Sequence, residues 1–271
     1  GGGGRGAAGG RRRAGRHARS GGSAARELGG GRKALGGTAG VEGVARRLGA
    51  GEVVWIGGPS GGGKAALLSL RTGSRTADGG RIHAGGAPVS RDNRPFAFMP
   101  QRDVLLPWRR VIDNAAIGLE VAGVRRAEAR RRVSRLLPAF GLEGTERLYP
   151  RQLSGGMRQR VSFVRAVVQE RPLLLLDEPF GALDAMTREE LQRWLLDVWA
   201  VHRWSVLLIT HDIREAIRLS DRVLVFSPRP GRVVGEVSVP RDIPRDDGFV
   251  LRPEVTVIED RVRRLLAGGA A

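Results

Sequence analysis

The chain has 271 residues, which is enough for one large domain or two small ones with a sizeable buried core. It carries 46 Lys and Arg against 28 Asp and Glu, a formal net charge of +18, and has no cysteine, so a disulfide framework and a thiolate metal site are excluded. No apolar run approaches the roughly 20 residues that span a bilayer, so we expect that the chain is not itself embedded in a membrane.

Residues 1–40 are mostly glycine, alanine and arginine, and the first aromatic residue of the chain is Trp55. Such a segment has too little apolar surface to offset its ordering entropy, so we predict a disordered tail. A basic, glycine-rich arm can bind nucleic acid or an anionic membrane without sequence preference. A solvated tail without a binding role is the simpler interpretation, because most basic runs have none.

The run Val53–Ile56 has the length and continuity of a strand that is buried on both faces. Directly after it comes a glycine-rich loop, Gly58-Pro59-Ser60-Gly61-Gly62-Gly63-Lys64, and then a segment rich in alanine and leucine. This is the strand–loop–helix setting of a phosphate-binding loop: backbone N–H groups surround a polyphosphate, the helix N-terminus adds its dipole, and Lys64 reaches the outer phosphates. A tight turn would explain the glycines but not the lysine at this spacing.

The loop departs from the usual pattern immediately after its lysine. Ser or Thr normally stands there and binds Mg²⁺ through its hydroxyl, whereas this chain has Ala65, followed by Ala66. Water can take the vacated position, because Mg²⁺ commonly keeps several waters and binds substrate phosphates. We therefore expect both alanines to lie at the bound nucleotide, with metal positioning and turnover weakened.

The segment of about 102–165 carries helical patterns and no clear strand, which predicts a helical insertion within an α/β core. One apolar stripe faces the core there: Val133, Leu136, Leu137 and Phe140. Near the end of the segment stands Leu153-Ser154-Gly155-Gly156-Met157-Arg158-Gln159-Arg160. A serine and two glycines that open a helix provide a second helix N-terminus suited to an anion.

Further along, three more apolar runs predict strands: Leu173–Leu176, Val206–Ile209 and Val223–Phe226. Between the first two runs an apolar stripe predicts a helix: Leu191, Trp194, Leu195 and Val198. Strands that alternate with helices indicate a mostly parallel sheet with crossover helices. Residues 227–247 are rich in Pro, Arg and Asp and predict a linker, and residues 255–266 predict a short terminal helix.

The run Leu173–Leu176 ends in two adjacent carboxylates, Asp177 and Glu178. The C-terminal edge of a parallel sheet is where ligands bind in such folds. Asp177 is placed to hold Mg²⁺, and Glu178 can orient or deprotonate an attacking water. The pair could instead cap the next helix, but its position behind a phosphate loop favours the catalytic interpretation.

The segment from Leu153 to Arg160 resembles the signature sequence of ABC nucleotide-binding domains, in the expected order with the phosphate loop and the two carboxylates. The resemblance implies an α/β fold of the P-loop NTPase (RecA-like) class with an inserted helical subdomain. It also implies roles for Gln101, which contacts Mg²⁺ and senses the γ-phosphate, for Asp184, which meets an opposing subunit, and for His211, which contacts the γ-phosphate. ATP and Mg²⁺ are the implied cofactors.

Domains of this family form head-to-tail dimers. Each ATP lies between the phosphate loop of one subunit and the signature residues of the other, here Ser154, Gly155 and Gly156. The resemblance further implies membrane-spanning permease subunits as partners at the cytoplasmic face, a periplasmic or lipid-anchored solute-binding protein acting indirectly, and no specific nucleic acid. We divide the chain accordingly into a tail (1–40), a nucleotide-binding domain (41–241) with its helical subdomain at about 102–165, and a C-terminal extension with a short helix (242–271).

Two short segments resemble the nitrate/sulfonate/taurine importer group: Leu106-Pro107-Trp108, and Ser227-Pro228-Arg229-Pro230-Gly231-Arg232. The first lies where such subunits receive their membrane partner, and an exposed Trp108 suits a contact surface. Packing of the same tryptophan inside the helical subdomain is the alternative.

These features together predict an ATPase that powers import of a small organic or inorganic anion. A hydrolysis-impaired subunit with a structural or regulatory role in a heteromeric ABC complex is the alternative that Ala65 raises. A soluble ABC ATPase that acts on nucleic acid through the basic tail is disfavoured by the two importer-like segments.

Overall fold

The computed structural model describes residues 26–28, 31–35, 38–41, 46–58, 79–80, 83–84, 87–88, 96–228 and 232–268. The helices are α2 (Val111–Val121), α3 (Arg126–Leu136), α4 (Gly155–Val167), α5 (Ala185–His202), α6 (Ile213–Leu219) and α7 (Pro253–Gly268), with short 3-10 helices η1 (Pro138–Phe140), η2 (Pro150–Gln152) and η3 (Phe249–Leu251). The main strands are β5 (Val53–Gly57), β9 (Phe96–Met99), β10 (Leu173–Asp177), β11 (Ser205–Ile209), β12 (Arg222–Phe226) and β13 (Val233–Ser238). Short strands are β1 (Arg26–Leu28), β2 (Gly31–Leu35), β3 (Thr38–Val41), β4 (Arg46–Leu48), β6 (Gly79–Gly80), β7 (His83–Ala84) and β8 (Ala87–Pro88).

The main strands form one sheet in the order β13-β12-β5-β11-β10-β9. Every neighbouring pair is parallel except β12 and β13, which are antiparallel. The four apolar runs that predict strands all lie in this sheet, so the predicted mostly parallel α/β core is confirmed. Parallel strands need crossover connections, and described helices supply them from β9 to β10, from β10 to β11 and from β11 to β12.

Both faces of the sheet are buried, which explains why its strands are apolar at consecutive positions. Val53 and Trp55 of β5 belong to the larger core cluster with the helices, whereas Val54 and Ile56 belong to a second cluster on the opposite face. Successive side chains of a strand point to opposite faces. A strand covered on both sides therefore shows no alternation with polar residues.

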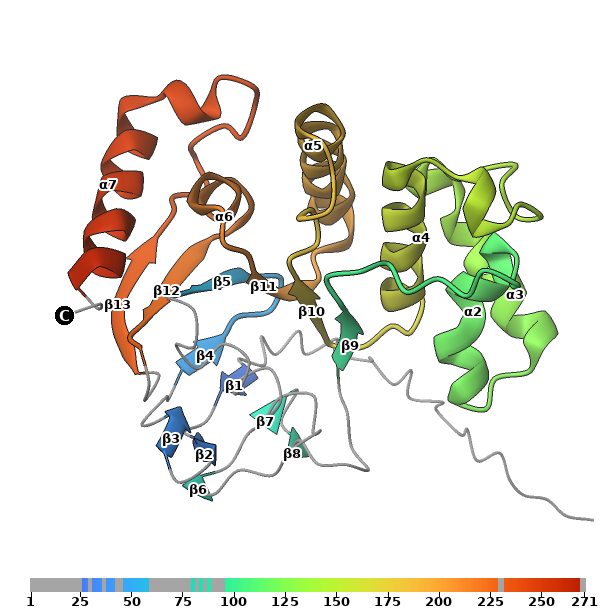
Figure 1. Cartoon of the computed structure of the whole chain (residues 1–271), viewed down its shortest axis with the longest axis horizontal. Helices are drawn as coiled ribbons and strands as arrows, with labels where there is room; N and C mark the ends of the chain where they lie inside the picture. Colours follow the sequence, from blue (N-terminus) through green and yellow to red (C-terminus); the bar gives the residue numbers. More distant parts are fainter. Residues whose placement is uncertain are drawn as a thin grey trace, which may run out of the picture.

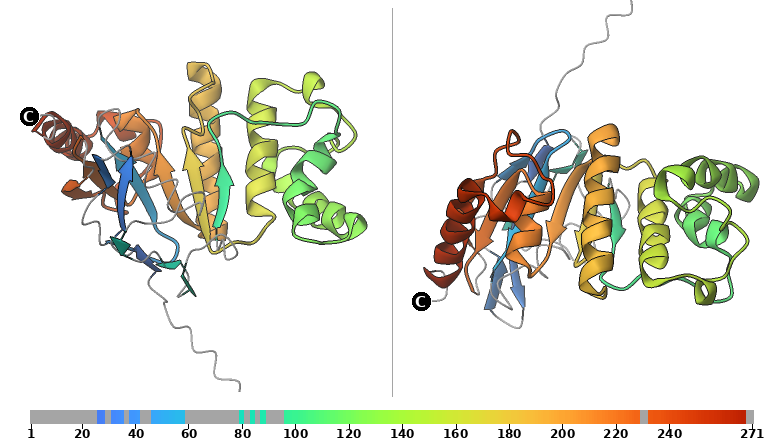
Figure 2. Two further views of the ribbon diagram at one scale, coloured as in Figure 1. Left: turned by 60° about the horizontal axis from the view of Figure 1, so that its bottom comes forward. Right: turned by 90° about the horizontal axis from the view of Figure 1, so that it is seen from above.

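The helices occupy two places around this sheet. Helices α5, α6 and α7 lie on one side of it, and α2, α3 and α4 form a group beyond the edge strand β9 (Figure 1). Figure 2 shows the same separation from two other directions. Trp194 of α5 joins the two groups, because its ring lies 5.7 Å from that of Phe163 in α4 and 5.0 Å from that of Phe140 in η1.

Two expectations from the sequence differ from the structure. Residues 227–247, predicted as a linker, contain β13, which pairs with β12 along its length. Its side chains are mostly half-buried or exposed, as in an edge strand, so the segment lacks the apolar continuity of the buried strands. The second half of the predicted disordered tail contains β1, β2 and most of β3. Strand pairing uses backbone groups, which glycine and arginine also supply. Residues 1–25 lie outside the described residues.

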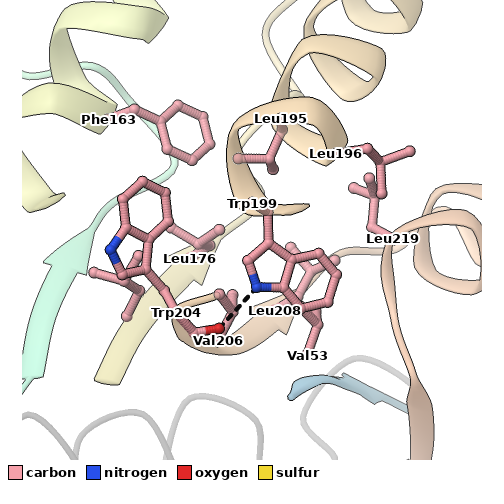
Figure 3. Close-up of a pocket in the computed structure, with 11 residues that line it drawn as sticks. Val53, Phe163, Leu176, Leu195, Leu196, Trp199, Trp204, Val206, Leu208 and Leu219 are labelled. Carbon is pink, nitrogen blue, oxygen red and sulfur yellow. Dashed lines mark hydrogen bonds between the residues drawn. The ribbon is translucent and has the colours of Figure 1, made fainter. Parts of the chain in front are cut away.

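The core between α5 and the sheet encloses a small apolar cavity of about 20 Å³ (Figure 3). Trp199 and Trp204 contribute its largest side chains, and the indole N–H of Trp199 donates to the Trp204 carbonyl at 2.8 Å. A cavity of this size and lining offers no polar partner for water or a ligand, so it is a packing feature of the core. None of the helices in the described ranges is long and apolar enough to cross a membrane.

Candidate functional site

The candidate site lies at the carboxyl ends of β10 and β11, which are adjacent and parallel. Asp177 is the last residue of β10 and pairs in register with Ile209, the last residue of β11. Glu178 follows with a φ of 48°, in the left-handed region, and its backbone N–H donates to the Ile209 carbonyl at 2.7 Å. The sheet therefore fixes the backbone of the two residues, Asp177 and Glu178, that carry the carboxylates.

Glu178 and His211 meet at this edge although they are 33 residues apart in the chain. The Nδ1 atom of His211 lies 2.7 Å from Oε2 of Glu178. The Glu178 side chain is 16 % exposed, whereas that of His211 is 74 % exposed. A largely buried carboxylate held by an accessible imidazole can orient a water or accept its proton, and the imidazole remains free to contact a ligand.

Asp177 and Glu178 do not cap the helix that follows them. The N-cap of α5 is Asp184, whose side chain accepts a hydrogen bond from the backbone N–H of Thr187 at 3.0 Å. This hydrogen bond lowers the pKa of the Asp184 carboxyl. Asp184 is exposed at the start of α5, close in sequence to the site but not in the Glu178–His211 contact.

The signature segment opens α4. Ser154 is the N-cap, and its hydroxyl accepts from the backbone N–H of Met157 at 3.2 Å. Gly156 is buried, and a Cβ atom there would lie 2.9 Å from Cγ2 of Thr187, whereas one at Gly155 would meet Leu183 at an ordinary 3.5 Å. Gly156 is therefore the position where α4 and α5 approach too closely for a larger residue.

Gly58 directly follows β5 and lies at the same carboxyl edge of the sheet. A Cβ atom at this position would lie 2.7 Å from the Phe226 carbonyl oxygen, so the close approach of β12 requires glycine. The remaining residues of the predicted phosphate loop lie outside the described residues: Pro59, Ser60, Gly61, Gly62, Gly63, Lys64, Ala65 and Ala66.

Gln101 follows β9, the edge strand next to β10, so it also emerges at the carboxyl edge. Its side chain is exposed, whereas Asp177 is half-buried. Among the described residues no three His, Asp or Glu side chains gather to hold a metal ion. One carboxylate and one amide oxygen nevertheless suit Mg²⁺, which usually relies on few protein ligands together with substrate phosphates and water.

The ABC transporter family model matches residues 41–181, a range that holds the phosphate loop, the signature segment and both carboxylates. The chain belongs to the ABC transporter family. The chain is also 46 % identical over 200 residues to the taurine import ATP-binding protein TauB of Chromobacterium violaceum, covering 74 % of this chain and 77 % of that protein. It is 43 % identical over 196 residues to the formylaminopyrimidine import ATP-binding protein ThiZ of Halalkalibacterium halodurans, covering 72 % and 76 %.

Solved structures agree with this assignment. The ABC transporter cassette MJ0796, described as a dimer, is 26 % identical, with a TM-score of 0.65 over 80 % of this chain and 98 % of that one. The cbiO1 subunit of Clostridium perfringens, at 24 % identity and a TM-score of 0.71 over 89 % and 98 %, shows the same fold. The predicted P-loop NTPase fold and the ABC-type ATPase class are therefore confirmed. The comparisons give no support to the alternative of a hydrolysis-impaired subunit.

Two buried residues of this ABC transporter subunit support the site and were missed by reasoning from the sequence. Trp55 of β5 donates its indole N–H to the Thr210 carbonyl at 3.0 Å and so fixes the backbone directly before His211. Glu215 of α6 is 5 % exposed, and burial, with the nearby Asp212 and Glu178 charges, raises its pKa to about 7. The sequence shows Glu215 as an ordinary polar residue of a helix, because burial at this depth depends on the packing of α5.

The loop after Gln101 presents Trp108 to solvent, with 71 % of the residue exposed. Val104 in the same loop is 58 % exposed. Packing of Trp108 inside the helical group, the alternative left open by the sequence, is therefore wrong. Exposed aromatic and aliphatic side chains in one loop of an ABC transporter subunit are suited to a protein contact.

Proposed function

We propose that this subunit binds and hydrolyses ATP to power import of a small organic or inorganic anion of the nitrate, sulfonate or taurine kind through membrane-spanning partner subunits, from the cytoplasmic face of the membrane. The observation that carries the ATPase chemistry is the Glu178–His211 contact at the carboxyl ends of β10 and β11. The taurine import function named for several relatives supports the class of solute.

Glu178 acts as the catalytic carboxylate in this proposal. It orients a water for attack on the γ-phosphorus and takes the water's proton as the bond to the β-phosphate oxygen breaks. His211 contacts the γ-phosphate while its Nδ1 side holds Glu178. Lys64 and the backbone N–H groups of residues 58–66 bind the polyphosphate.

Asp177 and Gln101 would hold Mg²⁺ together with the nucleotide. Bound there, the ion would neutralise charge that develops on the β- and γ-phosphates. Asp177 suits this task because it ends a buried strand, so its carboxylate is presented from a rigid backbone. The exposed Gln101 can adjust to the presence or absence of the γ-phosphate.

The partners follow from the same proposal. A second nucleotide-binding subunit, in the simplest case a second copy of this chain, places its Ser154, Gly155 and Gly156 on the ATP and its Asp184 at the interface. Permease subunits dock on the loop that carries Trp108, and a solute-binding protein delivers the anion to them. We also propose residues 41–241 as the nucleotide-binding domain, with 102–165 as its helical subdomain, and residues 242–271 as a C-terminal extension.

Turnover of ATP by the purified chain with Mg²⁺ tests the chemistry. Glu178→Gln removes the base and keeps the shape, so we expect a loss of about 10²- to 10⁴-fold in turnover with ATP binding retained. Glu190→Gln, at an exposed position of α5, is the matched control and keeps normal turnover. Unchanged turnover in Glu178→Gln would refute the assigned role. ATP-dependent taurine uptake by vesicles that contain the permease tests the solute class. If the vesicles take up neither taurine nor related sulfonates, this solute class is excluded.

A further inference from the structure

Helix α4 contacts the segment that follows Glu178 at three positions. Gln159 of α4 is 6 % exposed, and its side-chain amide Nε2 donates to the carbonyl oxygen of Pro179. Gly156 packs against Thr187, and Gly155 packs against Leu183. The N-terminal half of α4 is therefore joined to residues 179–187 by a buried hydrogen bond and by close packing.

The hydrogen bond from Gln159 acts on the peptide next to the catalytic carboxylate. Proline has no backbone N–H, so its carbonyl is the one backbone hydrogen-bonding group at position 179. Glu178 before it is in the left-handed region and is tied to β11 through its own N–H. The sheet thus holds the N-terminal side of Glu178, and Gln159 holds its C-terminal side.

Burying an amide costs free energy unless the amide is hydrogen-bonded. An apolar residue could fill the position of Gln159 without that cost. Packing alone therefore does not explain this residue. Its partner, the backbone directly after Glu178, indicates a role in positioning.

Helix α4 is also tied to the loop that follows Gln101. Arg158 Nε lies 3.1 Å from Oδ2 of Asp103, and Arg165 donates to the carbonyls of Asp103 and Val104 at 2.5 and 3.0 Å. The same helix therefore contacts the loop that exposes Trp108 and the backbone that carries Glu178.

We propose that Gln159 is a positioning residue that couples the signature end of α4 to Glu178 of the same subunit. This inference rests on the proposed function, in which the signature residues bind the ATP whose phosphate loop belongs to the other subunit. Seating of α4 on that ATP then fixes Pro179, and with it Glu178, in the subunit's own site. The two ATP sites of a dimer are linked in this way through one buried side chain.

The test uses the full-length chain and two substitutions at Gln159. Gln159→Met keeps the length of the side chain and removes the donor. Since small misplacements of a catalytic group cost up to about 100-fold, we expect a fall of about 10- to 100-fold in kcat with KM for ATP within about twofold. Gln169→Met is the matched control, because Gln169 lies just beyond α4 and its side chain donates to the Arg165 carbonyl of that helix, at 3.0 Å, rather than to Pro179. It should keep both constants.

Gln159→Glu separates the hydrogen bond from packing. The introduced carboxyl repels the Pro179 carbonyl when ionised and donates to it when protonated, so turnover relative to the native chain should rise as the pH falls from 8 to 6. A ratio that stays flat with pH while turnover is low would assign the loss to packing and overturn the proposal.

Hydrogen exchange of the backbone amides of residues 178–184, measured without nucleotide, tests the link independently of hydrolysis. We expect faster exchange in Gln159→Met than in the native chain, and no change in Gln169→Met. Equal exchange in all three chains overturns the inference even if ATP is hydrolysed. If the native chain fails to hydrolyse ATP but exchange is still faster in Gln159→Met than in the native chain, the proposed function is refuted. The link between Gln159 and the backbone after Glu178 is then still supported.

Discussion

Gly156 is the position in the signature helix where an added methyl group has no room. An alanine Cβ would lie 2.9 Å from Thr187 Cγ2 and 3.8 Å from Leu191 Cδ1. Forcing an extra methyl into a packed site costs about 1–3 kcal/mol. Replacing glycine by alanine within a helix stabilises it by roughly 0.5–1 kcal/mol, so we expect Gly156→Ala to destabilise the fold by up to about 2.5 kcal/mol.

Gly155→Ala supplies the matched control for this prediction. It gains the same helical preference one residue earlier, and its Cβ would meet Leu183 at 3.5 Å, an ordinary contact. The helical contribution cancels between the two variants, so the difference of about 1–3 kcal/mol between them isolates the clash. For a chain of this size each kcal/mol shifts Tm by about 2–4 °C.

Denaturant unfolding of the two variants, with the midpoint and the slope both fitted, measures the difference. Thr187→Ser removes the methyl group that the new Cβ meets, so in that background Gly156→Ala should lose most of its cost. Equal midpoints for Gly155→Ala and Gly156→Ala, or a cost that persists in the Thr187→Ser background, would refute the packing argument.

Three further predictions concern the carboxyl group beneath the site, the exposed loop and the phosphate loop. Burial raises the pKa of Glu215 in the folded state from its ordinary value of 4.5 to about 7, so stability should fall as the pH rises through that window, by about 3 kcal/mol in all. Glu215→Gln should flatten this slope in unfolding curves recorded between pH 4.5 and 8, and an unchanged slope would contradict the assignment. Trp108→Ala should leave stability within about 0.5 kcal/mol and basal ATP turnover unchanged, while import by vesicles containing the permease falls; unchanged import would exclude Trp108 from the contact. Ala65→Ser restores a hydroxyl ligand and should lower the Mg²⁺ concentration for half-maximal turnover, whereas an unchanged Mg²⁺ dependence would show that water replaces it fully.

The buried strands could be predicted from the sequence because burial on both faces leaves a continuous apolar run, as in Leu173–Leu176. The same criterion fails at the edge of the sheet. Strand β13 mixes one buried valine with half-buried and exposed positions, because solvent covers part of it, and its sequence therefore predicts a linker. The strands within the first 41 residues lie in glycine- and arginine-rich sequence. Amino-acid composition does not predict strand pairing there, because the pairing uses backbone groups that these residues also supply.

The candidate site could be predicted as a set of residues but not as a set of contacts. Strand order places Glu178 and His211 at one edge, yet their 2.7 Å contact depends on the left-handed turn at Glu178. Glu215 gave no signal, because a glutamate in a short helix has the same appearance in the sequence whether it is buried or solvated. The distinction requires knowing which helix covers it.

The signature segment shows how a motif can serve two purposes at once. Ser154 is exposed and Gly155 half-buried, which leaves them accessible for the nucleotide contact that we propose, whereas Gly156 and Gln159 are buried against the chain's own α5 and Pro179. The sequence assigned Gly156 to nucleotide binding on the strength of the motif, but its surroundings also require glycine for packing. A substitution at Gly156 should therefore disturb stability in addition to any effect on the proposed nucleotide binding, so loss of activity alone cannot assign its role. Because Gln159 and Gly156 share the inward face of α4, in the proposed dimer the segment that binds one ATP is packed against the segment that hydrolyses the other.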